Sequence, residues 1–356
     1  MKKIFKRRLV IAALFSAAAL ALRYGARLVP GFSDSYASWM NAFWVGTLGR
    51  LFSLLPFSAV EFAIYGLVLF AAVNVFLLFV SRTAREEAPA FLGTCLVLAG
   101  LIFFLFEANE DIYFYRTPFS SVYGYGAGSY TTEELAETAK MLAGEVGRWA
   151  PLVERGRDGG MVCGDDVSSR TAAAMETLGE TYPMLGGWYP KAKPVAWSYL
   201  MSITDLAGIY SAYTIEANYN RDMTEYNFPF TMSHELSHVK GVLQENEANF
   251  AAYLNCMNAK DADIRYSGAL LGWIYCGNEL YKRDKELWRE IALTLPAEAN
   301  YDLETNTAFW AGYKGRIADA AESFNDSYLK ARGQADGTES YDRVVDLIVS
   351  YEKAKG

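Results

Sequence analysis

The chain has 356 residues and a net charge of −8 at pH 7, with only two histidines and four cysteines. The charge is unevenly spread. Up to Phe106 there are ten Lys or Arg and four Asp or Glu, an excess of +6, which leaves −14 for the remainder. Such asymmetry indicates two parts with different surroundings, and the acidic part lacks the basic stripe that would indicate a nucleic-acid partner.

The basic, apolar first part predicts a membrane domain over residues 1–108. Three segments, at about 9–29, 59–80 and 88–108, are long and apolar enough to cross a bilayer. The Trp- and Phe-rich segment at about 39–57 predicts a helix lying in the membrane interface, or a poor fourth span. The first segment also resembles a signal peptide, with a charged start and a short apolar core. A retained anchor is favoured because no clear cleavage site follows.

The distribution of basic residues predicts the topology. Five Lys and Arg between residues 2 and 8 place the N-terminus in the cytoplasm. Three crossings then put residues 109–356 outside, and the turn that contains Arg82 and Arg85 falls inside. We therefore expect a multi-pass protein whose first partner is the lipid bilayer.

Residues 109–356 predict a mainly helical domain with a small sheet. Helical spacing recurs at 131–153 and 167–185, and again in most segments after residue 247. The segments 193–202 and 208–220 are rich in aromatic and branched residues, so they predict strands just before the histidines. The expected fold class is N-terminal transmembrane helices followed by this helical α+β domain.

The cysteines do not form a disulfide framework. Cys95 lies in a predicted span, and the other three would lie outside, where an odd number leaves at least one unpaired. Cys256 and Cys276 are a candidate pair, with Cys163 left over.

Both histidines lie in the stretch "PFTMSHELSHVKGVLQENEANFAAYL", where His234, Glu235 and His238 fit the motif H-E-x-x-H. On a helix, residues i and i+4 share one face, so both imidazoles can reach one metal ion. The plain alternative is two solvent-facing histidines. In a chain with two histidines, however, this spacing arises by chance roughly once in two hundred cases, which guards against a false motif match.

A catalytic zinc ion needs a third protein ligand and one open position. Glu245 and Asn249 stand four residues apart on the next predicted helix, which suits a ligand carboxylate with an amide beside it as its supporting group. Glu247 is the alternative third ligand. The ordinary explanation for Glu245 is that the helix dipole favours an acidic residue at a helix N-terminus, and Glu245 can have both roles.

This motif predicts a mechanism. Zinc lowers the pKa of its bound water and polarises the scissile carbonyl, while Glu235, which is not a ligand, acts as general base. With no third histidine in the chain, Tyr341 and Tyr210 are the candidate oxyanion donors, although an ordinary packing role is favoured for both. The segment 208–220 is also a candidate edge strand for pairing with an extended peptide.

The stretch around the histidines resembles the glutamate-zincin pattern, H-E-x-x-H followed by E-x-x-A-(D/N). The second part corresponds to Glu245, Ala248 and Asn249, although many members have Asp at the last position and a longer gap after His238. From "YFYRTPF" at Tyr113 onward, the chain more closely resembles a bacterial family of membrane-anchored H-E-x-x-H proteins, catalogued as a domain of unknown function and presumed to be zinc peptidases. The resemblance implies N-terminal spans in the cytoplasmic membrane and an outer, zincin-like zinc domain.

We therefore expect a membrane-anchored metallopeptidase with one zinc ion per chain, held by His234, His238 and Glu245. Its expected substrate is a protein or peptide of the cell envelope. The rival hypothesis is a non-hydrolytic zinc-binding membrane sensor or scaffold. Glu235 favours catalysis, because a structural zinc site does not require it.

Overall fold

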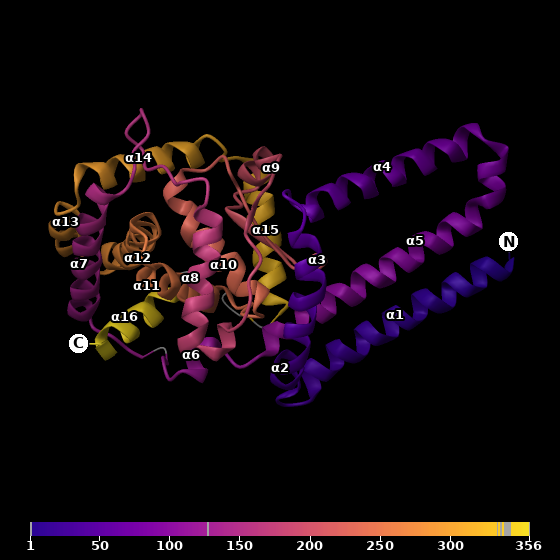
Figure 1. Cartoon of the computed structure of the whole chain (residues 1–356), viewed down its shortest axis with the longest axis horizontal. Helices are drawn as coiled ribbons and strands as arrows, with labels where there is room; N and C mark the ends of the chain where they lie inside the picture. Colours follow the sequence, from indigo (N-terminus) through magenta and orange to yellow (C-terminus); the bar gives the residue numbers. More distant parts are fainter. Residues whose placement is uncertain (1, 127, 333, 335–336, 338–342, 356) are drawn as a thin grey trace. The chain divides into compact units, whose positions relative to one another are not determined.

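The computed structural model describes residues 2–126, 128–332, 334, 337 and 343–355. The chain divides into two compact units (Figure 1). The first comprises Met1–Arg116 with Ser211–Glu216, and the second comprises Thr117–Tyr210 with Ala217–Gly356. The predicted boundary at residue 108 falls a few residues before this division.

Three helices of the first unit are long and apolar enough to cross a membrane, namely α1 (Lys2–Leu28), α4 (Ala59–Val80) and α5 (Arg82–Asn109). They overlap the three predicted segments, although α1 and α5 begin several residues earlier than predicted. Ser81 separates α4 from α5, and its hydroxyl caps α5 by accepting the N–H of Ala84. Length and composition thus support association with a membrane.

Helix α1 packs along α5 (Figure 1), and two glycines permit the close approach. A Cβ atom on Gly100 would lie 2.9 Å from the carbonyl oxygen of Ala12, and one on Gly93 would meet Phe5 and Arg8 at 3.1–3.2 Å. Small residues at such contacts let helix backbones approach each other in lipid, where packing drives association. Helix α1 is therefore packed closely against α5 within the first unit.

The segment predicted as an interfacial helix at about 39–57 is helical from an earlier start. It consists of α2 (Phe32–Trp44), a π-helical turn (Val45–Gly49) and α3 (Arg50–Ser53). The prediction relied on the dense aromatic residues and so missed the polar first turn of α2. Trp39 is 81% exposed within the described chain, as a side chain at a membrane interface would be.

The second unit is mainly helical, as predicted. A capping box begins its first long helix, because Thr131 and Glu134 each accept the other's backbone N–H. The segment 306–331, which has helical spacing in the sequence, contains the end of one helix and the whole of the next, separated at Gly312–Gly315. The helices are α6 (Phe119–Val122), α7 (Thr132–Trp149), α8 (Val167–Thr181), α9 (Ser198–Ile203), α10 (Phe228–Val239), α11 (Glu245–Asn258), α12 (Ala262–Arg283), α13 (Lys285–Ala292), α14 (Ala297–Ala311), α15 (Arg316–Lys330) and α16 (Val344–Lys355).

A small sheet precedes the histidine helix, as predicted. Its strands are β1 (Lys193–Pro194), β2 (Gly208–Ser211) and β3 (Glu216–Tyr219), in the order β1-β3-β2. Strand β1 runs parallel to β3, with Lys193 opposite Asn218. Strand β2 is therefore an edge strand of this sheet.

Both strand predictions were wrong in extent. In 193–202 only the first two residues form a strand, and α9 begins at Ser198. The buried residues Ser198, Met201 and Ser202 follow helical spacing, not the alternation of a strand. The segment 208–220 is a hairpin of two strands, which turns where Ile215 adopts φ +55°.

The core of the second unit lies among α10, α11 and α12. Met232, Leu236 and Val239, which form an apolar face of the histidine helix, are fully buried. Gly272 of α12 lies against the ring of Tyr253 on α11, where a Cβ atom would come within 2.9 Å. This packing fixes α10 and α11, the two helices that carry the candidate site.

Candidate metal centre

Local sequence fixes both ends of α10, the helix with the two histidines. Pro229 lies in its first turn, where backbone N–H groups have no partner within the helix, so proline costs no hydrogen bond there. At the other end Gly241 takes φ +74°, and its N–H donates to the carbonyl of His238. The N–H of Val242 donates to the carbonyl of Ser237. This pair of bonds is a Schellman ending, which stops the helix and turns the chain back toward the histidines.

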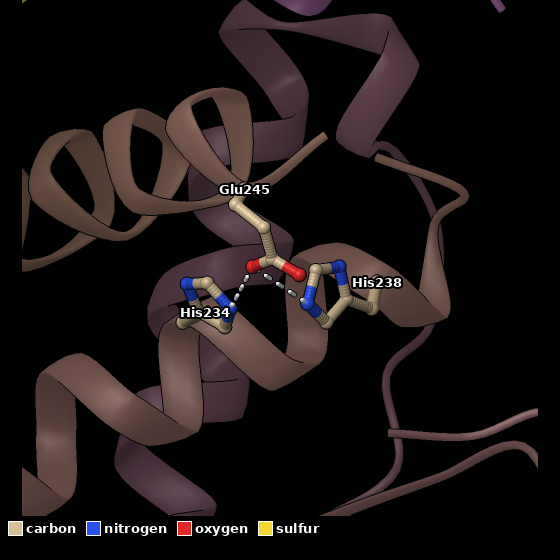
Figure 2. Close-up of side chains that lie close together, drawn as sticks. All are labelled: His234, His238 and Glu245. Carbon is tan, nitrogen blue, oxygen red and sulfur yellow. Dashed lines mark ion pairs between the residues drawn. The ribbon is translucent and has the colours of Figure 1, made fainter. Parts of the chain in front are cut away.

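Three predicted ligand residues come together between α10 and α11 (Figure 2). One ligand atom from each of His234, His238 and Glu245 lies within 4.8 Å of the other two. Oε2 of Glu245 is 3.2 Å from Nε2 of His234 and 3.8 Å from Nε2 of His238. The carboxylate on the first residue of α11 therefore faces both imidazoles.

The remaining ring nitrogens of the two histidines have partners of their own. Nδ1 of His234 lies 2.8 Å from Oδ1 of Asn249, and Nδ1 of His238 lies 2.7 Å from the carbonyl oxygen of Val242. A carbonyl oxygen accepts a hydrogen bond, so each Nδ1 carries the proton and each Nε2 keeps its lone pair toward Glu245. Partners of this kind orient histidine ligands and fix their tautomer.

The pKa values of the two histidines are shifted in opposite directions. Burial alone would lower the pKa of His234, but the hydrogen bond to Glu245 and the charges of Glu235 and Glu245 raise that pKa to about 9. Burial and the neighbouring charge of His234 instead lower the pKa of His238 to about 4. Without a cation, the raised pKa of His234 favours a second proton on that ring, at the Nε2 that faces Glu245, and a bound cation would take the place of that proton.

Glu235 lies beside this cluster but is not one of its members. Its side chain is buried, and its Oε2 accepts no hydrogen bond from any residue that the structure describes. Burial raises the pKa of Glu235 to about 8, partly opposed by the charge of His234. A desolvated carboxylate of this kind is a stronger base than an exposed one.

Strand β2 lies against Glu235. A Cβ atom on Gly208 would overlap with Oε1 of Glu235 and would come within 2.8 Å of its Cδ and Cγ. Two residues along the strand, the ring centroid of Tyr210 lies 6.2 Å from that of His238. The edge strand therefore runs past both the candidate base and one candidate ligand.

The donor set fits a zinc ion. Two neutral imidazole nitrogens and one carboxylate oxygen are ligands that zinc accepts, and three protein ligands are the usual number in a catalytic site. The orientation of both Nε2 atoms toward Glu245 agrees with such use.

The other candidate residues differ in their place relative to the cluster. The carboxylate of Glu247, the alternative third ligand, accepts hydrogen bonds from the backbone N–H and the hydroxyl of Ser120. Asn249 is beside His234, where the sequence predicted a supporting amide. Tyr341 lies outside the described residues, which leaves Tyr210 as the described candidate for an oxyanion donor.

Sequence reasoning missed two residues of the site, Val242 and Gly208. The signal for Val242 was Gly241, because a left-handed glycine after a helix turns the next carbonyl back toward the last turn. No local pattern indicated Gly208, because its approach to Glu235 comes from tertiary packing.

Comparison with known proteins gives one positive finding. Residues 36–349 match the family described as Protein of unknown function (DUF3810). A search of curated proteins and a search of solved structures each gave no match. The matched region includes α10, α11 and the whole metal cluster, and it covers most of the chain. The protein therefore belongs to the DUF3810 family.

Proposed function

We propose that this protein is a zinc-dependent peptidase, anchored in the bacterial cytoplasmic membrane, that hydrolyses peptide bonds of a protein or peptide in the cell envelope. One observation carries the proposal. Three donor atoms on α10 and α11 lie within 4.8 Å of one another, and the buried carboxylate of Glu235 lies beside them without being a donor. Structural zinc sites are normally closed by four protein ligands, whereas three ligands leave a position open for chemistry.

Each residue of the site then has a role. His234, His238 and Glu245 would hold the ion, which would supply Lewis acidity to a carbonyl oxygen and a water molecule. Glu235 would accept a proton from the attacking water and pass one to the leaving amine. Its burial supports this role, because desolvation makes the carboxylate more basic.

The geometry of β2 supports a peptide substrate. An extended segment can add to an exposed sheet edge through main-chain hydrogen bonds. Strand β2 is an edge strand, with Gly208 against Glu235 and the ring of Tyr210 near that of His238. A peptide paired with β2 would therefore pass the candidate base. Tyr210 is our candidate for the group that donates to the oxyanion.

The rival proposal, a zinc-binding sensor or scaffold without hydrolysis, explains less of the site. Such a protein needs the three donors, but it does not need a second carboxylate buried beside them. Burying Glu235 with an oxygen that accepts no hydrogen bond within the described chain is unfavourable for folding. A catalytic role gives a reason for that arrangement.

Two variants of the full-length protein in lipid nanodiscs test the proposal. In Glu235→Gln, bound zinc should stay at one ion per chain, measured by elemental analysis. Hydrolysis of a quenched fluorescent peptide library should fall by about two or more orders of magnitude, because the variant loses the base. In Glu245→Gln, zinc itself should bind more weakly, because a neutral amide is a poorer ligand than a carboxylate.

The same assays give the opposing outcomes. A folded parent protein that takes up no zinc would refute the metal site. If the parent binds zinc but hydrolyses no peptide, the peptidase proposal fails and the scaffold takes its place. If Glu235→Gln cleaves as fast as the parent, Glu235 is not the base. Comparing the N-termini of cell-envelope proteins between cells with the parent and cells with Glu235→Gln would then identify the substrate.

A further inference from the structure

Glu247 is a buried carboxylate two residues after the candidate ligand Glu245. Its Oε2 accepts the backbone N–H of Ser120 at 2.7 Å, and its Oε1 accepts the Ser120 hydroxyl at 2.8 Å. Both residues are almost fully buried, at 3% and 4% exposure. The bond thus joins the start of α11 to α6, which lies more than a hundred residues earlier in the chain.

The two acidic residues lie on different sides of α11. Side chains four apart on a helix share a face, whereas side chains two apart do not. Glu245 and Asn249 both face the histidines, and Glu247 faces α6. On the α6 side, the rings of Phe119 and Phe250 also pack, with centroids 6.2 Å apart. The first turn of α11 is therefore held between α10 and α6.

Glu247 makes this attachment instead of the hydrogen bond of a capping box. The N-cap residue of α11 is Gln244, which makes no capping hydrogen bond from its side chain to the described chain. In a capping box, the glutamate at the third helical position accepts the N–H of its own N-cap residue, as Glu134 does in α7. Glu247 has the same position in α11 but accepts the N–H of Ser120. The first helical turn, with Glu245 as its first residue, is thus held by a tertiary bond.

We infer that Glu247 is a positioning residue for the metal centre. Its bond to Ser120 keeps the first turn of α11 formed and directs Glu245 toward His234 and His238. The inference rests on the proposed function only through its zinc site. It assigns to Glu247 an effect on metal affinity without a bond to the metal.

Zinc affinity of the full-length protein in nanodiscs tests this inference, measured by competition with a chromophoric chelator. Supporting groups around metal ligands typically contribute 10- to 100-fold in affinity. We expect Glu247→Gln to weaken zinc binding by about 10-fold, because the amide replaces one of the two accepting carboxylate oxygens with an NH2 group and removes the charge. Ser120→Ala keeps the backbone donor and should weaken binding several-fold. The double variant should bind zinc about as weakly as Glu247→Gln alone, because the two residues act through one bond.

The matched control is Glu134→Gln. It makes the same substitution at the same helical position in α7, where the glutamate also accepts a backbone N–H. None of the cluster residues lies on α7, so zinc affinity should stay at the parent value. The visible spectrum of the cobalt-substituted protein adds a second readout. Glu247→Gln should change the cobalt bands, because Glu245 moves, and Glu134→Gln should not.

Three results would overturn the inference. Unchanged zinc affinity and cobalt spectrum in Glu247→Gln would show that the bond to Ser120 does not direct Glu245. Complete loss of zinc in Glu247→Gln, with no change in Ser120→Ala, would make Glu247 a ligand itself. A parent protein that binds no zinc would remove the metal centre, and the proposed function would fail together with the inference.

Discussion

Gly208 lies so close to Glu235 that a Cβ atom at that position would overlap with the carboxylate. The far end of a glutamate side chain can move, so Gly208→Ala should fold. The carboxylate, however, must leave its place beside the cluster. We expect zinc to bind as in the parent and peptide hydrolysis to fall by about 100-fold, the size expected for misplacing a catalytic group by about 1 Å. Elemental analysis and the peptide-library assay measure the two effects.

The control for Gly208→Ala is Gly144→Ala on α7. A Cβ atom there meets no other atom within 4 Å, apart from those of its own helix and chain neighbours. Alanine also favours a helix more than glycine does, by about 1 kcal/mol. This variant should keep full activity and unfold at an equal or slightly higher temperature. Full activity in Gly208→Ala would mean that Glu235 has no required position.

The ion pair between Arg23 and Glu107 joins α1 to α5 within the first unit. Nη2 of Arg23 lies 2.9 Å from Oε1 of Glu107, whose side chain is fully buried. Removing one partner of a buried pair is strongly destabilising, by about 3–5 kcal/mol, whereas apolar replacement of both is often tolerated. Arg23→Met should therefore lower the unfolding temperature in detergent, and Arg23→Met with Glu107→Leu should restore much of it.

An exposed pair in the same unit provides the comparison. Arg82 and Glu86 are 3.2 Å apart, with side chains that are 89% and 60% exposed. Exposed pairs contribute about 0–1 kcal/mol, so Arg82→Met should change the unfolding temperature little. If both arginine variants unfold at the parent temperature, the Arg23–Glu107 pair does not stabilise the packing of α1 on α5.

Cys163 should react slowly with alkylating reagents. Burial, together with the nearby charges of Asp263 and Glu225, raises the pKa of the Cys163 thiol well above its ordinary value. The thiolate is the reactive form, so a raised pKa means less thiolate at any given pH and slower alkylation. Peptide mapping after iodoacetamide treatment at pH 8 should find Cys163 mostly unmodified in the folded protein, and rapidly modified in denaturant.

The other cysteines extend this prediction. The sequence left Cys256 and Cys276 as a candidate disulfide, but both are buried free thiols. Burial raises the pKa of Cys256 to about 12. Mass analysis without a reducing agent should therefore find no bond between them. Fast labelling of Cys163 at neutral pH, or a recovered Cys256–Cys276 peptide, would contradict these expectations.

The sequence predicted what a single helix or one turn determines. His234 and His238 share a face because of helical periodicity alone, and Gly241 marks the end of that helix. Glu245 was predictable as a member of the cluster because the next helix begins only a few residues later. The three apolar helices of the first unit followed from length and hydropathy in the same way.

Features set by tertiary packing could not be predicted. The aromatic and branched residues after Lys193 predicted a strand, but the burial of Ser198, Met201 and Ser202 follows the helix α9. The bond between Ser120 and Glu247 joins residues that are far apart in the chain, and no local pattern marks either one. The sequence does not show this contact, so Glu247 remained an alternative third ligand because of its position near Glu245.

We expect the orientation of the protein in the membrane to be set by the basic residues near the start of the chain. Three helices are long and apolar enough to cross, and five Lys and Arg precede the apolar part of the first. Because basic residues tend to stay on the cytoplasmic side, we expect three crossings to place the candidate metal centre outside. Alkaline phosphatase, which is active only outside the cytoplasmic membrane, should be active when fused after Gly356 and inactive when fused after Arg85. A fusion of green fluorescent protein at the same two positions should give the reverse pattern, because it folds in the cytoplasm. A cytoplasmic C-terminus would refute both the three crossings and a substrate in the cell envelope. The candidate metal centre between α10 and α11 would then face the cytoplasm, and its substrate would have to be a cytoplasmic one.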